Sequence, residues 1–90
     1  MVKQRTKLKV EKSGLSGIEK ELLLYNYEHH SFEYVIKSLI EVCKHDAEQA
    51  EQCTMLTHYK GRCSVRTGSE KELRPFLEGL LVKGLNAEIE

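Results

Sequence analysis

The chain has 90 residues and a mass of 10.4 kDa, which is enough for one small hydrophobic core and excludes a two-domain enzyme or a repeat array. Its 14 basic and 14 acidic side chains give a formal net charge of zero, which argues against a protein built mainly to bind nucleic acid. No stretch approaches the roughly 18 apolar residues of a membrane span, and no apolar run follows Met1 as in a secretory signal. We therefore expect a cytoplasmic protein with no membrane contact.

The charge is distributed unevenly along the chain. Residues 1–12 contain five basic side chains and one acid, whereas the remainder contains nine basic side chains and thirteen acids. The residues between Ser13 and Gly17 are typical of a flexible hinge. We expect residues 1–17 to be a flexible basic N-terminal extension and residues 18–90 to be the folded domain. The extension is either a solvated terminus or an arm that touches an acidic partner.

The folded domain is predicted to begin with a buried strand over residues 21–25, a short apolar run between polar residues. Polar residues 26–30 end this strand, and Ser31 can cap a helix that continues to Lys44. Apolar side chains then recur at spacings of three and four residues, which gives the helix one apolar face. That face consists of Phe32, Val35, Ile36, Leu39, Ile40 and Cys43.

A second helix is predicted to begin at Asp46, with Gln49 three residues later, and to end near His58, before Gly61. Its inner face is expected to consist mostly of small side chains, so that another group can approach closely there. The face comprises Ala50, Cys53, Thr54, Leu56 and Thr57.

The last part of the chain predicts a strand, a helix and a closing strand. Residues 63–67 alternate as in a half-buried strand, and Ser69 with Glu72 forms a capping box. The helix that follows is predicted to end at Gly84, and Pro75 within it requires either a later start or a kink. Its apolar face consists of Leu73, Phe76, Leu77, Leu80 and Leu81. Residues 85–90 alternate again, so the order β-α-α-β-α-β predicts an α+β sandwich: a three-stranded antiparallel sheet covered by three helices.

The three cysteines, Cys43, Cys53 and Cys63, are odd in number, and no two lie two residues apart. A disulfide framework or a zinc ribbon uses an even, clustered set. We therefore expect reduced core cysteines, as in cytosolic proteins.

The sequence offers little support for a catalytic site or a metal site. His58 lies five residues from Cys53, a poor spacing for contact on a helix, and no glycine-rich phosphate loop is present. Glu28, His29, His30 and His58 could hold zinc only if the neighbouring histidines pointed the same way. We expect no enzyme, no metal site and no cofactor.

A trio of polar residues is the strongest candidate for a binding site. Asn26 and Glu28 lie in the loop after the first strand, and His58 lies at the end of the second helix. In the predicted sandwich these segments can meet at one mouth, and all three side chains can accept hydrogen bonds. An ammonium group with three donors, such as a free peptide N-terminus, matches them. The alternative is that they are ordinary loop and cap residues.

Three stretches carry a family resemblance. Residues 26–32 read NYEHHSF where the family has Asn-Asp-Asp-x-Thr-Pro-Met, residues 58–61 read HYKG where it has His-x-x-Gly, and residues 63–67 read CSVRT where it has Cys-Gly-Val-aromatic-Thr. In order and spacing, residues 22–90 resemble the ClpS family, the bacterial adaptors for AAA+ Clp proteases.

The resemblance implies an adaptor that recognises N-degrons: it holds substrate proteins whose first residue is Leu, Phe, Tyr or Trp. It then passes them to a Clp ATPase of the ClpA or ClpC type. The resemblance assigns Asn26, Glu28 and His58 to the substrate's α-amine, and it assigns residues 1–17 to delivery. The implied side-chain pocket consists of Val35, Thr54, Thr57 and Leu85, with Phe32 as gatekeeper. The implied ATPase-docking residues are Glu72 and Arg74.

Thr54 and Thr57 stand where the family has Met and Val, so two hydroxyls predict a wetter pocket and a different preferred first residue. A second resemblance, to the C-terminal domain of the ribosomal stalk protein, implies a protein-docking module of the same architecture without a peptide pocket. A monomer is the default expectation in either case.

Overall fold

The computed structural model describes residues 18–26 and 29–90. Within these residues the strands and helices follow the predicted order, and the α+β fold is confirmed. The elements are β1 (Lys20–Tyr25), α1 (Phe32–Cys43), α2 (Ala47–Lys60), β2 (Arg62–Gly68), α3 (Glu70–Val82) and β3 (Ala87–Ile89). The predicted extension, residues 1–17, lies outside the described residues. Across the described ranges, every helix is too short or too polar to cross a membrane.

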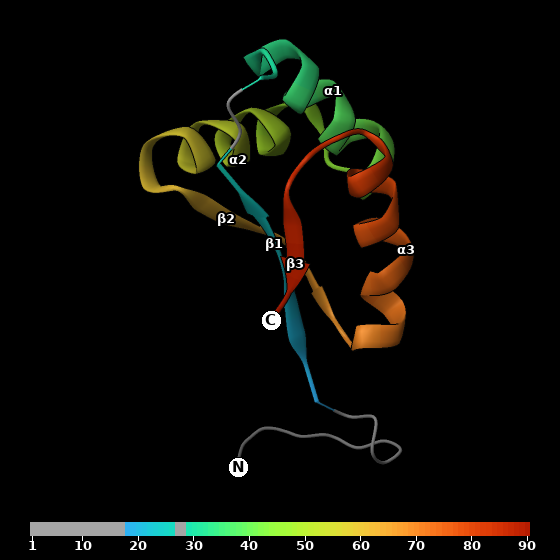
Figure 1. Cartoon of the computed structure of the whole chain (residues 1–90). Helices are drawn as coiled ribbons and strands as arrows, with labels where there is room; N and C mark the ends of the chain where they lie inside the picture. Colours follow the sequence, from blue (N-terminus) through green and yellow to red (C-terminus); the bar gives the residue numbers. More distant parts are fainter. Residues whose placement is uncertain (1–17, 27–28) are drawn as a thin grey trace.

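The sheet has β1 at its centre, paired antiparallel with β2 on one side and β3 on the other (Figure 1). Leu22 and Leu24 of β1 are fully buried, because alternate side chains of a strand point to the same face. Helix α3 contacts all three strands, and α2 contacts β2. The helices therefore cover the face of the sheet that carries these leucines.

Strand β2 contains a bulge where it pairs with β1. The register between β1 and β2 shifts after Leu22, so that Val65 is an extra residue on β2. Val65 is still buried, and its carbonyl accepts a hydrogen bond of 2.7 Å from Nε2 of His45. His45 thereby ties the loop between α1 and α2 to the irregular part of the sheet.

Each helix begins at the cap residue that the sequence predicts. The side chains of Ser31 and Asp46 each accept a backbone N–H from three residues further on, and Ser69 and Glu72 form the reciprocal capping box. Helix α3 contains Pro75 but begins directly after Ser69. A later start for this helix, one of the two predicted possibilities, is therefore wrong.

The core forms on the predicted helix faces, but some residues at the edges of these faces are exposed rather than buried. On α2, Ala50, Cys53, Thr54 and Thr57 are buried, but Leu56 is 43% exposed. At 100° per residue, Leu56 lies about 110° from the centre of the buried arc. Leu81 of α3 is also exposed, because it lies at the edge of the arc that faces the sheet.

The cysteines correct a second expectation. Cys53 of α2 and Cys63 of β2 form a disulfide with their Cα atoms 5.8 Å apart, and only Cys43 is a free, buried thiol among the described residues. The pairing arises because α2 ends at Gly61, whose left-handed φ of 93° reverses the chain into β2. Cysteines ten residues apart therefore meet across a helix–turn–strand, which a search for clustered cysteines does not reveal.

Candidate functional site

Asn26 directly follows β1 and is held beside the C-terminal end of α2. Its backbone N–H donates to the carbonyl of Gly61 at 2.9 Å, and its own carbonyl accepts from Nδ2 of Asn86 at 3.3 Å. The N–H of Gly61 in turn donates to Thr57 of α2 at 2.9 Å. These bonds bring the start of the loop, the end of α2 and the beginning of β3 together.

Glu28, the second acceptor of the predicted trio, lies outside the described residues. Its assignment to an α-amine remains a prediction.

His58, the third predicted acceptor, lies in the last turn of α2 and makes a ring contact with Phe32, the predicted gatekeeper. The centroids of the Phe32 and His58 rings are 5.1 Å apart at an interplanar angle of 71°, an edge-to-face arrangement. Tyr59 also contacts the imidazole, with ring centroids 5.0 Å apart at an interplanar angle of 81°. The first residue of α1 and the last turn of α2 are thus joined through exposed rings.

The other four residues of the predicted pocket are buried. Val35, Thr54 and Thr57 have no exposed surface, and Leu85 is 2% exposed. They come from α1, from α2 and from the segment between α3 and β3. The structure therefore sets these side chains inside the domain and Phe32 at its surface.

The two threonine hydroxyls do not face the predicted pocket as free polar groups. Thr54 Oγ1 donates to the Ala50 carbonyl, and Thr57 Oγ1 donates to the Cys53 carbonyl, each at 2.8 Å. Both hydroxyls are satisfied by the preceding turn of their own helix. Each hydroxyl has therefore used its one donor within the helix, and the expectation of a wetter pocket remains a prediction.

The predicted docking residues lie on the first turns of α3. Glu72 accepts a hydrogen bond from the Ser69 backbone N–H at 2.9 Å, and Arg74 forms an ion pair with Glu70. Both side chains are exposed. Since Glu72 also caps the helix, a change at this residue affects α3 as well as any partner that binds there.

Several residues near this site were not found by sequence reasoning. His30 stacks on Tyr34 with centroids 4.6 Å apart and donates to the Gly84 carbonyl at 3.1 Å, and the Tyr34 hydroxyl donates to the Lys83 carbonyl at 2.7 Å. They hold the start of α1 against the turn that leads to Leu85. Polar residues beside a loop carry no sequence signal for such a role, because their partners lie some 50 residues away.

The histidines do not assemble a metal site in the described part of the chain. No group of three or more His, Cys, Asp or Glu side chains there could hold a metal ion. His30 instead bonds to a backbone carbonyl, and His58 contacts the rings of Phe32 and Tyr59.

Comparison with known proteins identifies the family. Residues 19–82 match the family model described as "ATP-dependent Clp protease adaptor protein ClpS". A solved structure described as Agrobacterium tumefaciens ClpS2 bound to L-phenylalaninamide is similar in fold, with a TM-score of 0.74 and 17% sequence identity, over 80% of this chain and 94% of that chain. No curated protein matches the chain.

The stalk-protein domain was predicted as an alternative of the same architecture, so the fold alone does not separate the two families. The family model does separate them, because it matches well over half of the chain, from the start of β1 to the end of α3. ClpS proteins are adaptors for Clp AAA+ proteases rather than catalysts. The chain therefore belongs to the ClpS family.

Proposed function

We propose that this adaptor binds the free N-terminus of a substrate whose first residue is bulky and apolar. Asn26, Glu28 and His58 receive the α-amine. Phe32 covers the entrance to the side-chain site formed by Val35, Thr54, Thr57 and Leu85. The substrate is then delivered to a Clp ATPase of the ClpA or ClpC type in the cytoplasm by a monomeric adaptor.

The observation that carries this proposal is the contact between Phe32 and His58. It joins the proposed gatekeeper to a proposed amine acceptor. Phe32 begins the helix that carries the buried Val35, and His58 directly follows the buried Thr57. Because these side chains are buried, the proposal requires the Phe32 ring to move aside before a substrate side chain enters. Displacing one aromatic ring from a surface contact is a small local motion.

The chemistry of the acceptors supports recognition of a charged amine. A neutral imidazole, an amide oxygen and a carboxylate can each accept one of the three ammonium hydrogens. The ammonium loses its water shell on entry, so each missing acceptor leaves part of a charge unsatisfied. Truncating one partner of such a pair typically costs about 2–5 kcal/mol.

Delivery is assigned to the first turns of α3 and to residues 1–17. Glu72 and Arg74 are exposed at the start of α3, where Glu72 accepts from the Ser69 N–H and Arg74 pairs with Glu70. We assign the contact with the ATPase to these two charges. Exposed charges of this kind set the rate and orientation of encounter more than the final affinity.

The proposal is tested with His58→Ala. Fluorescence anisotropy with a labelled peptide beginning with Phe is expected to show at least a tenfold loss of affinity, because one acceptor of the ammonium is removed. Gln52→Ala, an exposed change on the same helix, is the matched control and is expected to bind like the unchanged protein. Circular dichroism must show both variants folded. Equal affinity of His58→Ala and the control would contradict the role of His58.

A further inference from the structure

The outer edge of β3 is unpaired. No strand in the described ranges lies on that side, since the sheet order is β2-β1-β3. Glu21 and Glu90 exchange two backbone hydrogen bonds of 2.8 Å across β1 and β3. In an antiparallel ladder, hydrogen-bonded pairs alternate with non-bonded pairs, so Ile89 and Ala87 direct their N–H and C=O groups away from β1. The edge therefore offers two donors and two acceptors to another extended chain.

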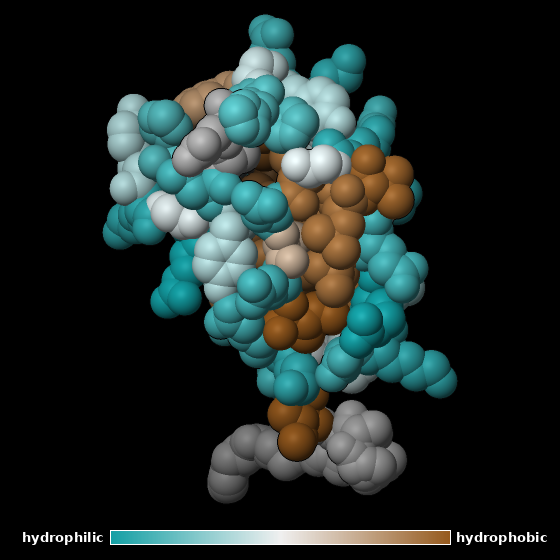
Figure 2. Space-filling view, in the orientation of Figure 1, coloured by the Kyte–Doolittle hydropathy of each residue, from teal (hydrophilic) through white to brown (hydrophobic). Residues whose placement is uncertain are grey.

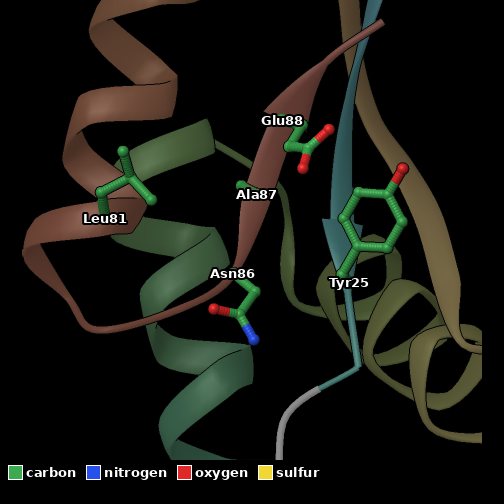
Figure 3. Close-up of a pocket in the computed structure, with 5 residues that line it drawn as sticks. All are labelled: Tyr25, Leu81, Asn86, Ala87 and Glu88. Carbon is green, nitrogen blue, oxygen red and sulfur yellow. The ribbon is translucent and has the colours of Figure 1, made fainter.

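A hollow of about 330 Å³ lies at the start of β3. It is lined by Tyr25 of β1, Leu81 of α3 and residues 86–88 around the start of β3 (Figure 3). Leu81 is 51% exposed, and the adjacent Val82 is 86% exposed. Figure 2 shows apolar surface gathered next to β3 on this side of the molecule. Large aliphatic side chains exposed beside an open strand edge are typical of a protein-binding surface.

The two faces of β3 differ in chemistry. Glu88 and Glu90 are exposed on the face away from the helices, and residues 84–90 contain no Lys or Arg. Glu90 accepts a hydrogen bond from the Tyr25 hydroxyl, which raises the pKa of Tyr25 and keeps the phenol neutral. The opposite face of β3 carries the buried Ala87 and the partly buried Ile89, and it lies against α3, which carries Leu81. A strand added here would meet an acidic surface and an apolar surface at alternate residues.

We propose that the outer edge of β3 binds an extended segment of a partner protein, in which Lys or Arg alternates with large apolar residues, as a fourth strand of the sheet. Backbone hydrogen bonds form with Ala87 and Ile89, the basic side chains lie near Glu88 and Glu90, and an apolar side chain packs on Leu81. A second copy of β3 is a poor occupant, because it would bring glutamates of like charge opposite one another. This pairing needs no free amine and does not rest on the proposed function.

The test uses the full chain and a synthetic peptide, Lys-Val-Lys-Leu-Lys-Val-Lys, acetylated and amidated at its ends so that it has no free α-amine. Calorimetry gives the affinity, and amide hydrogen exchange measured by NMR gives the location. At saturating peptide, exchange at Ala87 and Ile89 is expected to slow at least tenfold. Glu88→Lys is expected to weaken binding at least fivefold, whereas Glu51→Lys, an exposed change on α2, leaves affinity within twofold. His58→Ala is expected to bind this peptide normally.

Several outcomes would overturn the proposal. One is unchanged exchange at Ala87 and Ile89 with peptide bound, and another is equal affinity for a peptide with Glu in place of Lys. If Lys7→Glu with Lys9→Glu speeds exchange at these amides without peptide, the occupant is the chain's own basic segment rather than a partner. If the protection of the Ala87 and Ile89 amides from exchange rises with protein concentration in the absence of peptide, the occupant of the edge is a second copy of the chain. Failure of the amine site would show instead as loss of binding to free, Phe-initiated peptides.

Discussion

At the scale of single residues, the two threonines of α2 decide the character of the proposed side-chain site. Their hydroxyls donate to carbonyls of the preceding turn, so neither has a donor left for a substrate. Thr54→Val and Thr57→Val are each expected to keep the affinity for a Phe-initiated peptide within twofold. Each is also expected to change the free energy of unfolding by no more than about 1 kcal/mol. Peptide titration and urea unfolding measure the two quantities.

The matched comparison is Thr57→Ala, which removes the hydroxyl and a buried methyl group together. A fivefold loss of affinity in Thr57→Val would show that the hydroxyl itself contributes to peptide binding, which contradicts this expectation.

Cys43 provides a second test at this scale. Burial raises the pKa of its thiol to about 11, and the nearby Arg66 only partly opposes this shift. Because the thiolate is the reactive form, iodoacetamide at pH 8 is expected to label the folded protein roughly a hundredfold more slowly than an unperturbed cysteine. Unfolding in urea restores fast labelling, and Cys43→Ser abolishes it. Fast labelling of the folded protein would contradict the buried position of this thiol.

At the scale of the elements, the disulfide joins the helix that carries His58 to the strand that follows it. Cross-linking residues ten apart restricts the unfolded chain, an effect of about 2–3 kcal/mol for a loop of this length. Reduction with dithiothreitol is expected to lower the free energy of unfolding in urea by that amount. Cys43→Ser, which keeps the disulfide, is expected to show the same loss on reduction. An unfolding midpoint that reductant does not move would contradict the cross-link.

Most of the element pattern could be predicted because its signals are local. The caps at Ser31, Asp46 and Ser69 lie within four residues of the groups they bind, and the strand alternation repeats every two residues. The errors concern geometry that depends on residues far apart. Leu56 follows the helical spacing of its predicted face but is exposed, because it lies outside the buried arc of the helix. Cys53 forms a disulfide with Cys63 only because the chain reverses direction at Gly61.

At the scale of the whole molecule, the candidate site draws on segments from both halves of the chain. Sequence reasoning and the family resemblance named Phe32 and His58, and the structure brings their rings together. It also shows two hydrogen bonds near the site that no local sequence pattern predicts, one between His30 and the Gly84 carbonyl and one between Asn86 and the Asn26 carbonyl. These contacts connect residues 54 and 60 positions apart, so they exist only once the sheet has formed. Any variant that disturbs β3 is therefore expected to disturb the loop after β1.

The central claim is that the domain recognises a free α-amine together with the first side chain. The most direct measurement is an anisotropy titration of the unchanged protein with two peptides of identical sequence beginning with Phe, one with a free N-terminus and one acetylated. The free peptide is expected to bind at least tenfold more tightly, because only an ammonium can donate to Asn26, Glu28 and His58 together. Equal affinity for the two peptides would contradict the claim.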